Sequence, residues 1–496
     1  MADRRAHATA LARGVAERGL IIGSDRPTTA SGGTHTHRDP ATGAPVADVA
    51  LAGTVEVDAA VAAARDALPA WRALAPHRRA RLLNQLADRL DAEREDAATL
   101  TAVDNGTPVS TLDPGRAAAQ WTRYYAGWVD KLEGRVLPAP GGSGLDFVLP
   151  EPYGVIAAMV PWNGPMMGMG QKAAPALAAG NTVVAKPPEI APFGAVRFAE
   201  LALDAGLPPG VVNVVVGGAE AGAALTRHRG VDKISFTGGA AAAREVMVGA
   251  AEALTPLALE LGGKSANIVF ADADLDAAST ISGLLGAVLL SGQGCALPTR
   301  LFVHESVADE LVDRVVALVG SAAVGDPLDP ATLMGPLATE ASRDRVLAVI
   351  EEAIGAGATL RTGGRALGAD DLGHALAGGW FLAPTVLTDV DDDSDVARHE
   401  VFGPVLSVLT FTDEDEVVAR ANALPYGLAA YVHTRDLARA HRLAGDLEVG
   451  SVTVNGFPTN SPTVPFGGVK QSGFGREGGK EGLDEFLRPK NVLISE

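Results

Sequence analysis

The order of apolar and polar residues divides the chain into differently patterned parts. Up to residue 132, apolar residues recur at helical spacing, which predicts helices over residues 57–71, 78–95 and 114–132. From Gly154 onward, short apolar runs alternate with helical patterns. Strands are predicted over 155–160, 182–186, 211–216 and 234–237, and helices over 171–179, 192–205, 219–228 and 240–253. Repeated strand–helix units of this length predict a parallel sheet with helices on both faces.

A second series of strands and helices follows the first. Its predicted strands cover residues 265–270, 300–304, 385–387, 405–411 and 451–455, and its helices cover 275–290, 307–319 and 341–355. A Pro/Gly-rich passage over 138–144 leads into an alternating, strand-like run over 145–149. With a terminal strand over 488–494, this run predicts an arm that leaves the body. The fold class is therefore α/β, with two sheet-containing units and a small β arm.

Composition and charge narrow the partners that this fold would take. The 496 residues are 47% hydrophobic, which indicates a globular protein with a sizeable core. The net charge of −19, from 41 basic and 60 acidic residues, argues against nucleic acid or an anionic membrane as the partner. The first twenty residues lack the apolar core of a secretory signal, and the run 281–290 is interpreted as a buried helix. We expect a cytoplasmic protein with no metal site.

The chain contains a single cysteine, Cys295, in the segment Ser-Gly-Gln-Gly-Cys-Ala over 291–296. One cysteine cannot form an intrachain disulfide, so a stapling role is excluded. Most free cysteines are small buried hydrophobes, and this residue alone favours that interpretation. The neighbouring glycines allow close approach of the backbone, which leaves a nucleophilic role open.

Five short sequence motifs, which occur in a fixed order, favour the nucleophilic role of Cys295. They are Pro161-Trp-Asn-Gly, Leu259-Glu-Leu-Gly-Gly-Lys, the Cys295 segment, Glu400-Val-Phe-Gly-Pro and Pro465-Phe-Gly-Gly-Val-Lys-Gln-Ser-Gly-Phe-Gly-Arg-Glu. Together, and in this order, they resemble the aldehyde dehydrogenase superfamily of the NAD(P)-dependent, hydrolytic type, from about residue 40 to the C-terminus. The resemblance implies a Rossmann-like NAD-binding domain (1–132 and 151–258), a catalytic α/β domain (259–462) and an oligomerisation arm and tail (133–150 and 463–496).

The resemblance also assigns catalytic roles. Cys295 is expected to attack the aldehyde carbon, because a thiolate adds readily to carbonyls and the resulting thiohemiacetal expels hydride. Glu260 is expected to be the general base, and its apolar surroundings suit it to accept protons near neutral pH; without the resemblance it could be a surface carboxylate. The Asn163 amide is expected in the oxyanion hole. Lys172 and Glu477 match further polar positions near the site.

The expected cofactor site lacks the Gly-x-Gly-x-x-Gly fingerprint. The cluster that begins at Gly217 is weak evidence by itself, whereas Gly238 and Gly239 match the family's loop against the cofactor phosphates. Here the chain departs from the family, because Gly239 replaces the usual serine and Ala243 replaces a glycine. One hydrogen bond to the phosphates is therefore expected to be missing.

Four further residues are expected to hold the two ends of the cofactor. Lys186 and Glu189 match the family's pair for the adenosine ribose, where a carboxylate favours NAD, although NADP remains possible. Glu400 and Phe402 match the residues at the nicotinamide end. The family pattern places two more residues, Trp162 and Leu261, beside the cofactor.

The expected substrate channel departs most from the family pattern. Gly164 and Gln171 stand where relatives often carry aromatic residues, and Asn460 matches a third channel position. Leu297 adds apolar bulk after the nucleophile. A widened, more polar channel predicts a larger or partly polar aldehyde. Two alternatives stay open, a CoA-acylating aldehyde dehydrogenase and a catalytically silent cofactor-binding scaffold. The arm predicts a homodimer or homotetramer.

Overall fold

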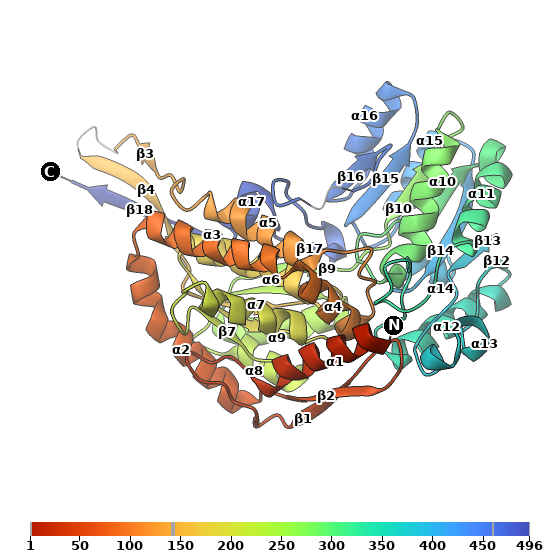
Figure 1. The fold of residues 1–496 in the computed structure, drawn as a ribbon. Helices are drawn as coiled ribbons and strands as arrows, with labels where there is room; N and C mark the ends of the chain where they lie inside the picture. Colours follow the sequence, from red (N-terminus) through yellow and green to blue (C-terminus); the bar gives the residue numbers. More distant parts are fainter. Residues whose placement is uncertain (1, 140–143, 459–460, 496) are drawn as a thin grey trace.

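A computed structural model describes residues 2–139, 144–458 and 461–495. Figure 1 shows two sheet-centred bodies side by side, with a slender arm projecting from the first. The first body contains β1 (Thr34–Arg38), β2 (Pro45–Ala50), β5 (Val155–Met159), β6 (Thr182–Lys186), β7 (Val212–Val214), β8 (Lys233–Gly238), β9 (Leu257–Leu261) and β17 (Gly473–Phe474). Its helices are α1 (Ala2–Glu17), α2 (Thr54–Ala73), α3 (Pro76–Ala92), α4 (Arg94–Asn105), α5 (Pro114–Ala126), α6 (Pro165–Ala179), α7 (Phe193–Asp204), α8 (Ala219–Arg227), α9 (Ala240–Ala253) and α17 (Gly479–Asp484).

The sheet of the first body has the order β17-β9-β8-β5-β6-β7, and every pair is parallel except β17 with β9. β5 is buried along its whole length, which matches its uninterrupted apolar sequence. The alternating strands and helices predicted from residue 155 are present. Helix α6 begins six residues before the predicted start at residue 171, because Gly164 caps it and Pro165 occupies its first turn.

The second body is built on β10 (Ala266–Val269), β11 (Arg300–His304), β12 (Thr359–Thr362), β13 (Thr385–Thr388), β14 (Val405–Phe411), β15 (Ala429–His433) and β16 (Ser451–Val454). Their order is β12-β13-β14-β11-β10-β15-β16, and only β12 is antiparallel to its neighbour. The helices of this body are α10 (Leu275–Gly283), α11 (Ala308–Gly320), α12 (Glu340–Gly355), α13 (Ala369–Leu372), α14 (Asp395–Arg398), α15 (Glu414–Asn422) and α16 (Leu437–Asp446). The α/β fold class is confirmed.

The expected domain boundary between residues 258 and 259 is wrong, because it cuts through β9. Glu260 pairs with Thr237 of β8 and therefore belongs to the first sheet. The pair Gly262-Gly263 directly follows this apolar strand, and there the chain crosses to the second sheet. The expected tail is also divided, since β17 joins the first sheet and only β18 (Leu487–Ile494) joins the arm.

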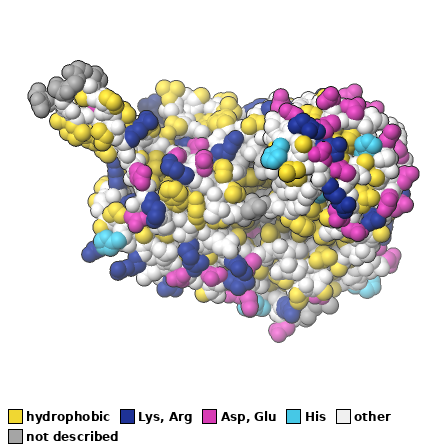
Figure 2. All heavy atoms as spheres, turned by 90° about the horizontal axis from the view of Figure 1, so that it is seen from above, with side chains coloured by type: hydrophobic (Ala, Val, Ile, Leu, Met, Phe, Trp, Pro, Cys, Tyr) yellow, Lys and Arg dark blue, Asp and Glu magenta, His cyan; other side chains and the backbone are white. Residues whose placement is uncertain are grey.

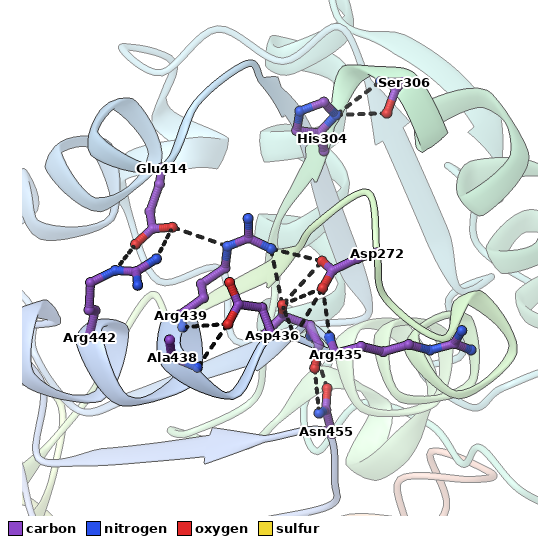
Figure 3. A network of polar contacts seen from close by, with 11 residues as sticks. Asp272, His304, Ser306, Glu414, Arg435, Asp436, Ala438, Arg439, Arg442 and Asn455 are labelled. Atoms are coloured by element: carbon purple, nitrogen blue, oxygen red, sulfur yellow. Dashed lines mark hydrogen bonds and ion pairs between the residues drawn. The ribbon is translucent and has the colours of Figure 1, made fainter.

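The two sheets face the space between the bodies with opposite ends of their strands. The carboxyl ends of β5, β6, β8 and β9 open onto it, as expected for parallel sheets. The second sheet presents its amino ends, because Cys295 precedes β11 and Glu400 precedes β14. Its carboxyl ends are closed by the polar network in Figure 3, in which Arg439 donates to Asp272 at 2.8 Å and both Arg439 and Arg442 pair with Glu414.

The arm is a three-stranded antiparallel sheet of β3 (Arg135–Leu137), β4 (Leu145–Pro152) and β18, in the order β18-β4-β3. It stands clear of the body at the left of Figures 1 and 2, and hydrophobic side chains gather on it. The exposed apolar residues of the arm are Val136, Leu145, Leu149, Leu493 and Ile494.

Helix α1 joins the two bodies. It begins beside the second body and runs beneath the first (Figure 1). Arg5 forms ion pairs with Asp39 of the first body and Asp326 of the second, and both carboxylates are buried. Arg4 donates to the Leu328 carbonyl at 3.1 Å, and the Leu328 side chain packs into the core of the first body.

The segment Leu275–Gly292 is apolar and long enough to cross a membrane by length and composition alone. In the structure 61% of it is buried, and its residues pack on the second sheet in the same core as β11 and β14. This is the packing expected for the run 281–290 as a buried helix.

We predict that Arg5→Ala lowers the free energy of unfolding by about 3 kcal/mol, because two buried carboxylates lose their partner. Urea denaturation measures the change. Arg26→Ala, at an exposed arginine that contacts only carbonyls of its own turn, is the control and should change stability little. Equal losses in the two variants would contradict the role of Arg5 as a link between the bodies.

Candidate active site

A cavity of about 700 Å³ lies between the two bodies. The first body supplies most of its wall from the carboxyl ends of its strands. The second body closes it with Cys295 from the loop before β11, with Ser342 and Arg345 from α12, and with Glu400 and Phe402 from the segment before β14. The cavity thus collects residues that lie far apart along the sequence, including the only cysteine.

Cys295 sits on a tightly wound loop. After α10 the chain forms a wide π-turn over Leu284–Val288, and then Leu290 and Ser291 adopt left-handed conformations with φ of 55° and 53°. Such conformations cost energy in non-glycine residues and cluster at functional sites. Burial, followed by the carboxylates of Glu400 and Glu260, raises the pKa of the Cys295 thiol to about 12. The thiol is therefore protonated at neutral pH and needs a base to become a nucleophile.

Glu260 supplies a buried carboxyl group in the same cavity. It lies on β9, its side chain is 5% exposed, and among the residues that the structure describes neither carboxyl oxygen has a hydrogen-bond partner. Burial, together with the nearby charge of Glu477, raises the pKa of Glu260 well above its ordinary value. The short strand β17 pairs Gly473 with Glu260 along the backbone, and a side chain on Gly467 of the tail would collide with a Glu260 carboxyl oxygen, so the tail packs against this carboxyl.

Asn163 follows β5 on the turn into α6. Its side-chain amide donates to the Gln293 carbonyl, two residues before Cys295, at 2.9 Å. The amide is thereby held against the loop that carries Cys295. Lys172 of the same helix is 1% exposed and binds Glu477 at 2.6 Å and Ser235 at 3.0 Å. These polar contacts lead from the cavity wall beside Glu260 toward the tail.

The far end of the cavity has the residues expected around an adenosine ribose. Lys186 and Glu189 both line it, and burial lowers the pKa of Lys186 while Glu189 opposes that shift. Gly238 and Gly239 line the wall at the start of α9, and a Cβ atom on Gly239 would meet no atom within 4 Å. Gly218, rather than the expected Gly217, lies on the wall. Gly217 instead packs closely against Ala221.

Glu400 and Phe402 lie at the end of the cavity near Cys295. Glu400 accepts a hydrogen bond from the Gly263 N–H at 3.2 Å, and a side chain on Gly262 would collide with the Glu400 carboxylate. Burial raises the pKa of Glu400 to about 7, against the opposing effect of that hydrogen bond. Phe402 has a left-handed φ of 50° and meets the edge of Trp162, with ring centroids 5.4 Å apart. Leu261 also lines this end.

The expected channel residues lie apart from this cavity wall. Gly164 caps α6, and Gln171 lies on the half-buried face of that helix. Leu297 packs against the cluster around Tyr431 and Ile281 in the second body. Asn460 falls outside the described residues. Sequence reasoning missed Ser342 and Arg345, because no local motif marks their positions, and it gave no role to Gln293, although this residue lies within the Cys295 segment.

Comparisons with known proteins agree with this geometry. The sequence model of the aldehyde dehydrogenase family matches residues 28–492. The chain is 42% identical over 486 residues to the NADP/NAD-dependent aldehyde dehydrogenase PuuC of Escherichia coli (strain K12), covering 97% of this chain and 96% of that protein. It is 42% identical over 482 residues to the mitochondrial aldehyde dehydrogenase of Leishmania tarentolae, covering 96% and 95%.

Solved structures give the same result. PnpE in complex with nicotinamide adenine dinucleotide has a TM-score of 0.92 and 41% identity, with 97% of this chain and 98% of that chain covered. The NAD⁺ complex of an aldehyde dehydrogenase from Bacillus cereus has a TM-score of 0.91 and 38% identity, with 96% of each chain covered. The resemblance predicted from the ordered motifs is confirmed, and this chain belongs to the aldehyde dehydrogenase family.

Proposed function

We propose that this enzyme oxidises an aldehyde to the carboxylic acid, with NAD as the hydride acceptor and a covalent intermediate on Cys295. The proposal rests on one observation. The Cys295 thiol, the buried Glu260 carboxyl and the Asn163 amide, which is held by the Gln293 carbonyl, all line the same cavity. In the first step the Cys295 sulfur bonds to the aldehyde carbon and the thiol proton passes to Glu260. The second amide N–H of Asn163 stabilises the oxyanion that forms.

The electrostatics of the cavity suit a base that works near neutral pH. Because the Cys295 thiol has a pKa of about 12, a carboxyl with an ordinary pKa would remove its proton poorly. The raised pKa of Glu260 narrows the difference between the pKa of the base and that of the thiol. After hydride has left the thiohemiacetal, Glu260 releases the thiol proton to solvent. The ionised Glu260 then takes a proton from water, the resulting hydroxide adds to the thioester carbon, and breakage of the C–S bond releases the acid and the Cys295 thiolate, which takes up the proton from Glu260. The charges of Glu477 and Lys172 act on the Glu260 carboxyl with opposite sign.

The cavity residues fit NAD. Bound NAD supplies the hydride acceptor. Lys186 and Glu189 would hold the adenosine ribose, where the Glu189 carboxylate disfavours a 2′-phosphate, so NADP is the weaker fit. Gly239, at the start of α9, leaves open backbone near the pyrophosphate position, and Glu400 would accept hydrogen bonds from the nicotinamide ribose. A hydroxyl is missing at Gly239, which predicts weaker phosphate binding.

We predict that Cys295→Ala abolishes NADH formation, because no other residue can form the thiohemiacetal.

Glu260→Gln should slow thioester hydrolysis more than hydride transfer, leaving a pre-steady-state burst of NADH and a steady-state rate reduced by about 100-fold or more. Stopped-flow absorbance with purified enzyme and saturating NAD measures both phases.

A Cys295→Ala enzyme with full activity would refute the mechanism. Turnover that requires coenzyme A would show an acylating enzyme, and absence of NADH with every aldehyde would indicate a silent scaffold. The same assay tests the proposal that Gly164, Gln171 and Leu297 border a channel for larger or partly polar aldehydes. That proposal fails if kcat/KM is highest for aldehydes of about two or three carbons.

Glu400 gives a prediction for the pH dependence of cofactor binding. Below pH 7 its carboxyl becomes protonated and loses acceptor capacity, so NAD should bind about tenfold more weakly at pH 5.5 than at pH 8. Quenching of protein fluorescence by NAD measures the dissociation constant, since Trp162 lines the cavity. Glu400→Gln should flatten this dependence. An unchanged pH dependence in that variant would show that another group titrates.

We propose that the arm binds a second copy of this chain. Its apolar residues are exposed in the single chain, and β3 and β18 leave unpaired strand edges of the kind that pair between molecules. We predict a dimer or tetramer by light scattering, shifted to smaller species by Leu145→Asp. The control is Leu437→Asp, at an exposed leucine on α16 in the second body. A monomeric wild-type enzyme at micromolar concentration would refute the proposal.

A further inference from the structure

Gln293 forms hydrogen bonds with three other residues, and none of the catalytic roles proposed above accounts for them. It lies two residues before Cys295 and is 3% exposed. Its carbonyl accepts from the Asn163 amide at 2.9 Å. Its side-chain oxygen accepts from the Ala338 N–H at 3.0 Å, and its side-chain nitrogen donates to the Leu290 carbonyl at 3.3 Å. One residue thus contacts the proposed oxyanion donor, the strained loop and a distant segment.

The distant segment is the entry to α12. Ala338 immediately precedes Thr339, whose hydroxyl caps α12 by accepting from Ser342 N–H at 3.1 Å. Ser342 and Arg345 on that helix line the cavity. The Gln293 side chain therefore ties the nucleophile loop to the helix that forms the opposite part of the wall.

The loop needs such a tie because its backbone is strained. Leu290 and Ser291 have left-handed φ values, which a non-glycine residue keeps only when its surroundings hold it there. Two buried side-chain contacts do so, one from Gln293 to Ala338 and one from the Ser291 hydroxyl to the Gly335 carbonyl at 2.8 Å. Of these two residues, only Gln293 also contacts Asn163.

We propose that Gln293 is a positioning residue for the oxyanion hole. Its side chain fixes the loop, the loop fixes the Gln293 carbonyl, and that carbonyl accepts one N–H of Asn163 so that the other faces the oxyanion. The inference rests on the oxyanion role proposed above for Asn163. It adds that the direction of the amide is set from the nucleophile loop, so that donor and nucleophile move together.

The Gln293→Met variant keeps the size of the side chain and removes both of its hydrogen bonds. We expect kcat to fall about 10- to 100-fold, because displacement of a reacting group by about 1 Å has effects of this size. The dissociation constant of NAD, measured by fluorescence, should stay within about twofold, since the ribose-binding residues are untouched. Gln293→Glu keeps the acceptor for the Ala338 N–H and should retain more activity than Gln293→Met.

A double-mutant cycle tests the mechanism of this loss. Asn163→Ala should reduce kcat by about 100- to 1,000-fold, the usual effect of losing one oxyanion donor. If Gln293 acts through Asn163, the double variant Asn163→Ala/Gln293→Met should be no more than about threefold slower than Asn163→Ala alone. Multiplication of the two single losses would overturn the proposal.

Two controls separate positioning from general loosening of the loop. Ser291→Ala removes the other buried contact of the loop and should cost less than about threefold in kcat, because the Asn163 contact stays. An equal loss in Ser291→Ala and Gln293→Met would overturn the proposal. Gln85→Met, at an exposed glutamine of α3, should leave kcat unchanged. Full activity in Asn163→Ala would instead refute the oxyanion assignment, whatever Gln293 does.

Discussion

The candidate site depends on the short crossing between the two sheets, where the backbone must pass very close to the Glu400 carboxylate. Strand β9 of the first sheet ends at Leu261, strand β10 of the second sheet begins at Ala266, and Gly262-Gly263 lie in the crossing between them. No side chain fits at Gly262, because the Glu400 carboxylate occupies that space, and the Gly263 N–H binds the same carboxylate at 3.2 Å. The Cys295 carbonyl also approaches Gly263. The proposed base, the nucleophile loop and Glu400 therefore meet around two glycines.

Burial at this crossing dominates the electrostatics. Burial, followed by the carboxylates of Glu400 and Glu260, raises the pKa of the Cys295 thiol to about 12, which favours a neutral thiol at rest. Burial also raises the pKa values of Glu260 and Glu400, and at Glu260 the charge of Glu477 adds to the shift. A protein that kept its cysteine as a thiolate would have placed cations here. In the proposed mechanism, ionisation of the thiol depends instead on the neighbouring Glu260 carboxyl.

The sequence predicted the α/β class, most strands of the parallel sheets and the residues carried by ordered motifs, because periodicity and short strings are local signals. It could not predict contacts between distant residues. Gln293 reaches a residue 45 positions away and Arg5 one 321 positions away, and neither partner belongs to a motif. The domain boundary failed for a related reason, since an apolar strand does not show which sheet it joins. Gly217 was expected on the cavity wall, but it packs tightly against Ala221. Gly218 lies on the wall instead.

The central claim is that Cys295 carries the acyl group and that Glu260 releases it. Intact-protein mass spectrometry of Glu260→Gln, mixed with aldehyde and NAD and quenched in acid, tests this most directly. The account predicts a single added acyl mass that hydroxylamine removes, and that a Cys295→Ala/Glu260→Gln enzyme lacks. An enzyme that forms NADH without acquiring this mass, or that acquires it without Cys295, would contradict the account.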